Sequence, residues 1–580
     1  MKKKEKRKKK GRSFVCFITG HRRSIQKKIK NKKVPPVCEP RTVATGLLDD
    51  QTRGAVCPDR SIESGTVGQQ RDSGTVGQRW GTAAVFEFES IGPSIHPSVA
   101  GARRDRATRE RGPTVDPRRN AKRNNGGETA VMGEREEDGA KKDSDSGSDS
   151  GLKCELLYCG ATDHGAIGRV TKSPDAKYPD LNEPTKFAGL EGKTWRAVGA
   201  GSCAAHCAAI DSDGVVHVWG RNERGQCGTN DYVNRGKPTV VQGLKDVKCV
   251  AVACGRSHTV VVAENGDVYG FGSNKFGQLG CGAVKQQKKK GDGEDDRLTP
   301  VKALVTNGAA VSCGADFTAV LTRDGEVFTF GMPQYGQLGH GTDHEYNKSA
   351  SSIKIVYEPQ PHPRRVTANG FGERKIVKVR CGHNHVVCFD DAGKIWTWGN
   401  GGYGRLGHKV QQDEFAPRMV EIQGGDRNLV PKDAVIGAGS VSSFVSAVQG
   451  QLYAFGKLKT AGDNTMYPTP FLGLSGWVLR DFACGHVTYA ACAEKSAVTW
   501  GGGLYGELGY GPSGKKSSAQ PDLVPSLEGK TTHRVAAGNG FTLFLVDKED
   551  AKDLPSFTPG PDVETKPEPK APPAKKAKKK

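Results

Sequence analysis

The sequence predicts an all-β fold, a seven-bladed β-propeller with disordered basic termini, from three observations. A motif of one aromatic residue and three spaced glycines occurs seven times along the chain, and a second glycine-containing motif also occurs seven times. A pattern of strand, turn and strand separates the two motifs. Repeated units of about 45–70 residues cannot each bury a core alone, but a ring of them packs every sheet against its neighbours.

The first motif begins with an aromatic residue and a glycine, and two further glycines follow at fixed spacing. In "WGRNERGQCG" and "FGSNKFGQLG" the pattern is clear. Glycine at a constant position is expected where backbone approaches backbone and where sharp corners need a positive φ angle. The clear copies begin at Trp219, Phe271, Phe330, Trp398 and Trp500, and weaker copies begin at Phe455 and Cys159.

The second motif precedes the first by about fifteen residues and reads "ACGRSHTVVV" in one of its clear copies. Between the motifs, turns such as "ENGD" at Glu264 separate runs of β-branched and aromatic residues, which indicates β-hairpins. The clear copies begin at Ala253, Ser312, Arg380 and Ala483, and weaker copies begin at Gly199, Gly437 and Ala536.

The two ends of the repeat array predict how the ring closes. The glycine-rich copy at Cys159 precedes every copy of the second motif, and no glycine-rich copy follows the second motif at Ala536. A mixed blade with strands from both ends of the domain accounts for both facts. Truncation at residues 543–546 is therefore expected to be disproportionately destabilising.

Composition divides the chain into three parts. Residues 1–151 are expected to be a disordered leader, basic and then acidic; residues 152–547 form the propeller; and residues 548–580 are a disordered tail rich in Pro and Lys. The acidic, Ser-rich tract after Met132 is typical of the start of nuclear proteins, so Met132 is one candidate for the natural first residue. Most of the net charge of +22 lies at the two ends, which suggests a polyanionic partner.

No apolar run approaches the ~20 residues that a membrane helix needs, so no membrane span is predicted. The sixteen cysteines contain no C-x-x-C pair and no two pairs at zinc-finger spacing. We expect free, buried thiols in a reducing compartment, and neither a metal site nor a cofactor.

Catalytic interpretations of the sequence are weak. Residues 220–228, "GRNERGQCG", contain G-x-x-x-x-G, but a phosphate-binding loop needs Lys and then Ser or Thr, where this chain has Gln226 and Cys227. The histidines of the blades recur at one repeat position, which suits structural hydrogen bonds, and no nucleophile with a matching base is apparent. The sequence predicts a binding module that makes and breaks no bonds, and is therefore not an enzyme in that sense.

The tandem units of "CG..HT" and "GQLG" type resemble the regulator of chromosome condensation repeat over residues 152–547. The founding member of that family is a seven-bladed exchange factor for the small GTPase Ran. Stretches such as "GSCAAH" and "TMYP" resemble one branch of the family more closely. That branch implies a nuclear, mitosis-associated protein linked to Rac-like small GTPases, the spindle and microtubules.

The resemblance also implies candidate contacts for a GTPase. In the Ran exchange factor, the loops of the second motif lie on the side that faces the GTPase. The alternative is that these residues only shape the turns. The loop residues that would correspond here are Arg256, His258, Asp316, His383 and His385.

Loop length points to a second set of contacts. Most repeats take about 26–33 residues from the last glycine of the first motif to the next second motif, whereas the chain takes 42 residues from Gly339 to Cys381. Long insertions are usually functional or disordered. We expect residues 341–356 to act as a wedge or docking loop against the GTPase, with Asp343, Glu345, Tyr346 and Lys348 as candidate contacts.

The basic ends suggest further partners. The C-terminal cluster resembles a nuclear import signal and would bind chromatin or the acidic tails of microtubules without sequence preference. Two functions remain open: a monomeric exchange or regulatory factor for a Rac-like GTPase in mitosis, and a non-catalytic scaffold on chromatin or microtubules. The cluster consists of Lys575, Lys576, Lys578, Lys579 and Lys580.

Overall fold

The structure is a computed structural model of the 580-residue chain, which divides into two units, residues 1–132 and 133–580. It describes residues 153–168, 179–285, 295–347, 355–422, 429–447, 450–459 and 462–564, all in the second unit. The predicted leader, Lys348 and the C-terminal lysine cluster lie outside the described residues.

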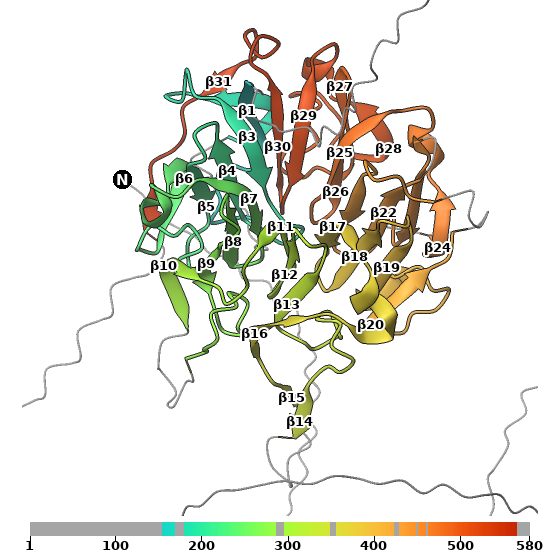
Figure 1. Cartoon of the computed structure of the whole chain (residues 1–580). Coiled ribbons are helices and arrows are strands. Elements are labelled where there is room, and N and C mark those ends of the chain that lie inside the picture. Colours follow the sequence, from blue (N-terminus) through green and yellow to red (C-terminus); the bar gives the residue numbers. More distant parts are fainter. Residues whose placement is uncertain are drawn as a thin grey trace, which may run out of the picture. The chain divides into compact units, whose positions relative to one another are not determined.

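Seven four-stranded antiparallel blades form a propeller, as the repeats predict (Figure 1), and a bridge between Cys154 and Trp195 joins two of the blades into one larger sheet. Blade 1 contains β3 (Trp195–Gly199), β4 (His206–Asp211), β5 (Val216–Gly220) and β6 (Val233–Val240). Blade 2 contains β7 (Cys249–Cys254), β8 (His258–Ala263), β9 (Val268–Ser273) and β10 (Asp296–Lys302). Blade 3 contains β11 (Gly308–Cys313), β12 (Phe317–Thr322), β13 (Val327–Gly331) and β16 (Gln360–Arg365).

The remaining blades follow the same order from the inner to the outer strand. Blade 4 contains β17 (Ile376–Cys381), β18 (His385–Asp390), β19 (Ile395–Gly399) and β20 (Glu414–Val420). Blade 5 contains β21 (Ile436–Ala438), β22 (Ser442–Ser446), β23 (Leu452–Gly456) and β24 (Thr465–Pro470). Blade 6 contains β25 (Leu479–Cys484), β26 (Thr488–Ala493), β27 (Ser496–Gly502) and β28 (Ser517–Leu523).

The closing blade joins both ends of the domain and confirms the predicted mixed blade. Its central strand β30 pairs on one side with β29 and on the other side with β1, in an unbroken register from Cys154 opposite Asp547 to Gly160 opposite Phe541. The strand β2 pairs with the outer side of β1. The four strands are β29 (Thr532–Ala537), β30 (Phe541–Asp547), β1 (Cys154–Gly160) and β2 (Leu181–Phe187).

Short 3-10 turns complete the blades. In five places among the described residues, the chain forms such a turn in the segments that connect strands. These turns are η2 (Gln242–Leu244), η3 (Ala368–Glu373), η4 (Gly402–Gly404), η7 (Leu472–Leu474) and η8 (Pro525–Leu527). No helix among the described residues is long and apolar enough to cross a membrane.

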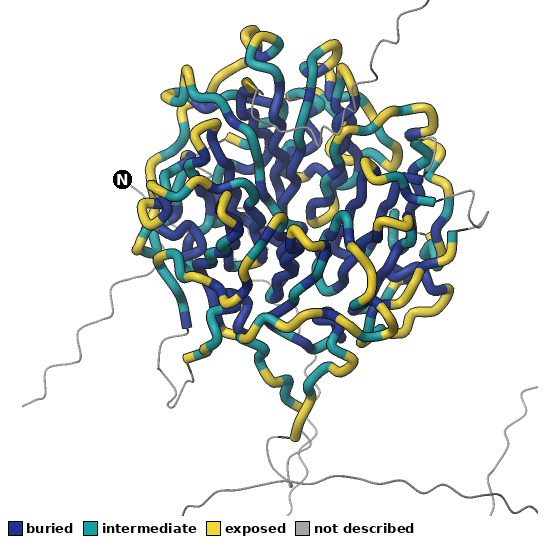
Figure 2. The backbone as a smooth tube through the Cα atoms, viewed as in Figure 1, coloured by how far each residue is buried: buried dark blue, intermediate teal, exposed yellow. Residues whose placement is uncertain are grey.

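The hydrophobic core lies between neighbouring blades, where Figure 2 shows the buried strands, while the exposed residues gather in the loops. The first motif builds these contacts. A Cβ atom at Gly228, the last glycine of the motif in blade 1, would lie 2.9 Å from the ring of Phe271 in blade 2. The same contact recurs between Gly280 and Phe330, between Gly339 and Trp398, and between Gly407 and Phe455. Burial of each large ring contributes about 1.5–3 kcal/mol.

Residues 220–228 have the architectural role that the sequence predicts. Gly220 adopts a φ angle of 108°, and a Cβ atom there would lie 2.6 Å from the Cα atom of His206. The amides that a phosphate loop would need are already bonded inside the loop: Cys227 N donates to Asn222 Oδ1, and Gly228 N donates to Gly225 O. Both the backbone and its hydrogen bonds therefore exclude a phosphate cradle here.

The propeller extends beyond residue 547, which corrects the predicted boundary of the tail. Residues 548–564 form a C-terminal strap along two blades, in which β31 (Ser556–Phe557) pairs with β2 and β32 (Val563–Glu564) pairs with β6. Leu554 is buried, and the Phe557 ring lies 4.9 Å from that of Phe187. Strands of two residues are too short to give a periodic pattern, so the composition of the segment predicted disorder.

Candidate functional site

Two kinds of loop open at the same end of the ring. In blade 3, β11 pairs with β12 through Cys313 and Thr318, and β12 pairs with β13 through Phe317 and Gly331. The loop after the inner strand and the loop after Gly331 therefore leave the sheet together. We call this end the loop face. In blades 1–4 it carries the inner loops 255–257, 314–316 and 382–384 and the described parts of the outer loops, residues 221–232, 274–285, 332–347 and 355–359.

Backbone hydrogen bonds join successive inner loops around the mouth of the central channel. Each loop is a tight turn, such as the one closed by Gly255 N donating to His258 O at 2.8 Å. Arg256 N donates to Ala315 O at 3.0 Å, and Ala315 N donates to His383 O at 2.9 Å. The second motif thus folds into a connected rim that fixes the side chains of neighbouring blades relative to one another.

The rim brings three of the predicted contact residues together. The Arg256 guanidinium lies 3.2 Å from Asp316 Oδ2 and 3.3 Å from His383 Nε2. Burial lowers the pKa of His383 to about 4, and the charge of Arg256 acts in the same direction, so the ring is neutral and accepts a hydrogen bond. Burial raises the pKa of Asp316, although Arg256 and Lys275 oppose this shift.

A hollow of about 480 Å³ lies beside these three residues. Its lining includes three cationic side chains, Arg224, Arg256 and Lys275, and the single carboxylate of Asp316. Side chains of the outer loop of blade 3, among them Gln334 and Tyr335, complete it. The hollow therefore presents a positive, partly aromatic surface that suits an acidic partner segment.

The long insertion after Gly339 forms a β-hairpin that projects beyond the blades (Figure 1). It consists of β14 (Glu345–Asn347) and β15 (Ile355–Tyr357), paired antiparallel with Tyr346 opposite Val356. Glu345 is exposed, Tyr346 is 47% exposed, and Asp343 is half-buried at the base of the hairpin. The three described candidates of this loop are therefore available on a protruding element.

The base of the hairpin contacts the wall of the hollow. Tyr357 forms a side-chain hydrogen bond with Gln334, and burial followed by the nearby charges of Asp343 and Glu345 raises the pKa of its hydroxyl. The hairpin and one wall of the hollow, which includes Gln334 and Tyr335, belong to the same outer loop of blade 3. A partner that bound in the hollow would therefore meet the hairpin as well.

His258 and His385 have a different position from the rest of the predicted contacts. They are the first residues of β8 and β18, and their side chains are fully buried between blades. His258 Nε2 lies 3.1 Å from Thr318 Oγ1, and His385 Nε2 lies 2.9 Å from Ser443 Oγ. These contacts join neighbouring blades, so the structure assigns both histidines to packing and leaves neither side chain accessible to a partner.

His258 is expected to make the stability of the propeller depend on pH. Burial lowers its pKa in the folded state to about 3, below the unfolded value, so the unfolded chain binds the extra proton between these values. The contribution of the buried, neutral His258 ring to the free energy of unfolding is complete above about pH 6.5, and it is smaller by about 2 kcal/mol at pH 5. Denaturant unfolding at pH 7 and pH 5 should show a smaller loss of stability for His258→Gln than for the parent. The exposed control His362→Gln should behave like the parent.

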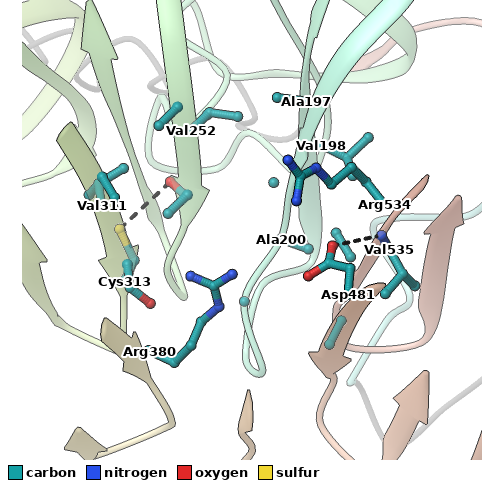
Figure 3. A pocket seen from close by; sticks show the side chains of 18 of the residues that line it. Ala197, Val198, Ala200, Val252, Val311, Cys313, Arg380, Asp481, Arg534 and Val535 are labelled. Carbon is teal, nitrogen blue, oxygen red and sulfur yellow. Dashed lines mark hydrogen bonds between the residues drawn. The ribbon is translucent and has the colours of Figure 1, made fainter. Parts of the chain in front are cut away.

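The central channel is the second hollow of the domain, with a volume of about 600 Å³. Inner strands of all seven blades line it, and small apolar residues such as Val252 and Val311 form much of its wall. Figure 3 shows Arg380 and Arg534 directed into it, with Asp481 accepting a hydrogen bond of 3.1 Å from the amide of Val535. Among the predicted contacts that the structure describes, none lines the channel.

Sequence reasoning missed Arg224, Lys275, Gln334 and Tyr335, which line the hollow. The signal for them was present, because all four lie between the first two glycines of the first motif. Those positions vary from copy to copy, while the glycines around them stay constant. Loops held by constant glycines, with side chains that vary between the glycines, are typical of a binding face on a repeat fold.

Comparison with known proteins agrees with the repeats. The regulator of chromosome condensation repeat matches residues 213–262, 265–321, 324–389, 392–439 and 498–545, and a second model of the repeat matches residues 249–278 and 309–337. The crystal structure of Prp20p from Saccharomyces cerevisiae shares the fold, with a TM-score of 0.53, 18% identity, and coverage of 69% of this chain and 94% of that one. The chain is thus a seven-bladed propeller of regulator of chromosome condensation repeats.

Two curated relatives show which branch of the repeat family the chain belongs to. The chain is 36% identical over 437 residues to Protein RCC2 homolog of Xenopus laevis, across 71% of this chain and 82% of that protein. It is 35% identical over 443 residues to human Protein RCC2, across 70% of this chain and 81% of that protein. The chain therefore belongs to the RCC2 family.

Proposed function

We propose that this propeller binds a Rac-like small GTPase through its loop face and regulates nucleotide exchange on it. The observation that carries the proposal is the convergence of Arg256, Asp316 and His383 beside a cationic hollow, on the face from which the hairpin projects. Membership of the RCC2 family supports a GTPase partner, as does the Prp20p structure, which is described with its binding to Gsp1p and histones.

The geometry suits exchange by differential binding. An exchange factor accelerates nucleotide release when it binds the nucleotide-free GTPase more tightly than the loaded one, and no bond needs to form or break. A rigid rim can dock the partner while a protruding element presses on one part of it. Here the rim residues provide the dock and the hairpin β14–β15 provides the wedge, with Glu345 and Tyr346 at its exposed surface.

We further propose that the protein acts in the nucleus and on chromosomes or the spindle during mitosis, as a monomer. The lysine clusters at the two ends of the chain support contact with polyanions such as chromatin or microtubules. The alternative function, a scaffold that binds a GTPase without exchange, uses the same loop face. It differs in one measurable property, the rate of nucleotide release.

Deletion of residues 342–352 tests the proposal. The parent is expected to accelerate release of labelled GDP from a Rac-like GTPase by about 10–100-fold, and the deletion variant by less than a tenth of that factor. Deletion of residues 286–293, from the outer loop of blade 2, is the matched control and should release GDP like the parent. Acceleration that survives the 342–352 deletion would rule out the wedge. Tight binding without acceleration on any GTPase of a panel would establish the scaffold.

A further inference from the structure

Three side chains of types that bind metals lie close together on the closing blade, away from the loop face. The Cys154 thiol, the His533 ring and the Asp547 carboxylate each offer one ligand atom, and these atoms all lie within 4.8 Å of one another. His533 Nε2 and Asp547 Oδ1 are already 3.0 Å apart. We propose that Cys154, His533 and Asp547 form a zinc site that fastens the closing blade.

The geometry is close to that of a tetrahedral site. Zinc binds sulfur at about 2.3 Å, imidazole nitrogen at about 2.0–2.1 Å and carboxylate oxygen at about 2.0–2.2 Å, which puts neighbouring ligand atoms about 3.3–3.6 Å apart. The His533 and Asp547 atoms, now 3.0 Å apart, would have to separate slightly, and the Cys154 sulfur would have to approach them by little more than 1 Å at most. A water molecule would take the fourth position, as in other sites with three protein ligands.

The chemistry of the three ligands favours zinc over the common hard cations. Calcium and magnesium prefer sets of oxygen ligands, whereas a thiolate with an imidazole selects Zn²⁺ or a similar transition metal. Burial also suits a metal site: Cys154 is fully buried, while the side chains of His533 and Asp547 are 18% and 40% exposed. The thiolate would anchor the ion from inside, and the two outer ligands would leave a path for its entry.

The strands explain why the three residues meet. Cys154 and Asp547 lie opposite each other in the β1–β30 ladder, so their side chains share one face of the sheet. His533 lies at an irregularity in the β29–β30 register, between Thr532 and Arg534, which gives it a position outside the regular alternation. The ion would connect the first strand of the propeller to the last two.

This site would act on the stability of the ring rather than on the partner surface. A ligand that binds only the folded state stabilises it in proportion to the logarithm of its concentration above Kd. Closure of the ring depends on β1 pairing with β30. A metal bound across these strands would therefore couple ring closure to the supply of zinc.

Metal titration of the full-length protein tests the site directly. One equivalent of Co²⁺ should produce a thiolate-to-cobalt charge-transfer band together with the visible bands of tetrahedral Co²⁺, and Zn²⁺ should displace it. Zinc at about 100 times its Kd should raise Tm by about 3 °C. The variants Asp547→Asn and His533→Gln change side chains that are only partly buried, and each should weaken metal binding at least tenfold. Cys154→Ser should abolish the charge-transfer band.

The thiol control is Cys281→Ser, because Cys281 is the one described cysteine whose side chain is partly exposed while the others are buried. This variant should keep the band and the rise in Tm. A band that persists in Cys154→Ser, or zinc affinity unchanged in both Asp547→Asn and His533→Gln, would overturn the proposal. So would a parent protein with no cobalt band at one equivalent. Circular dichroism of each variant establishes that a lost band reflects the ligand and not the fold.

Discussion

A chain that ends at Gly540 is expected to lose the cooperative unfolding transition of the propeller altogether. The truncation removes β30, which pairs with β29 on one side and along its full length with β1 on the other. It also removes the five large apolar side chains of β30, all of them fully buried: Phe541, Leu543, Phe544, Leu545 and Val546. At about 1.5–3 kcal/mol each, their loss is comparable with the whole stability of a typical domain, about 5–15 kcal/mol.

Calorimetry and denaturant unfolding of a matched series would test the role of β30. A chain ending at Asp547 keeps β30 and lacks the C-terminal strap and the residues after it. It should keep a single transition at a lower temperature, because the strap buries few side chains. The point variant Phe544→Ala should cost about 3–5 kcal/mol, and the exposed Leu504→Ala should cost less than about 0.5 kcal/mol. A cooperative transition in the chain ending at Gly540 would show that the ring does not depend on its mixed blade.

The fold could be predicted from the sequence because its repeats encode contacts that recur from blade to blade. The last glycine of one motif and the aromatic ring of the next form the same contact at four successive places, from Gly228 with Phe271 to Gly407 with Phe455. The mixed closing blade could be predicted because one end of the repeat array has an extra copy of the first motif and the other end has an extra copy of the second. The strap could not be predicted, because residues 548–564 pair through two-residue strands whose partners lie far away in the sequence.

The candidate site was only partly predictable, for a geometric reason. In "GHNH" of blade 4, His383 lies on the rim and His385 begins the next strand, with its side chain buried against the neighbouring blade. The two histidines are two residues apart, and the sequence contains nothing that separates a turn position from the first strand position. The contact between Arg256 and His383 could not be predicted without the arrangement of the blades in the ring, because 127 residues separate the two along the chain.

Reversal of charge at Arg256 is expected to weaken GTPase binding more than any other single change on the loop face. Its side chain is 51% exposed, and it is the common partner of Asp316 and His383. Arg256→Glu would remove the cation at the centre of the rim and place a second carboxylate beside Asp316. Arginines at the centre of an interface are frequent hot spots, so we expect a loss of affinity of about 100-fold. Binding to immobilised GTPase, measured in the nucleotide-free state, gives this value.

The control for Arg256→Glu must separate contact with the partner from the shape of the rim. The double variant Arg256→Glu with Asp316→Arg restores an ion pair in reversed order, so it should recover stability but not affinity if the two side chains touch the partner. Arg323→Glu changes a turn residue that bonds to Glu264 O at the opposite end of the blades, and it should bind like the parent. Full recovery of affinity in the double variant would mean that the rim only positions other contacts, and the hairpin would then carry the binding.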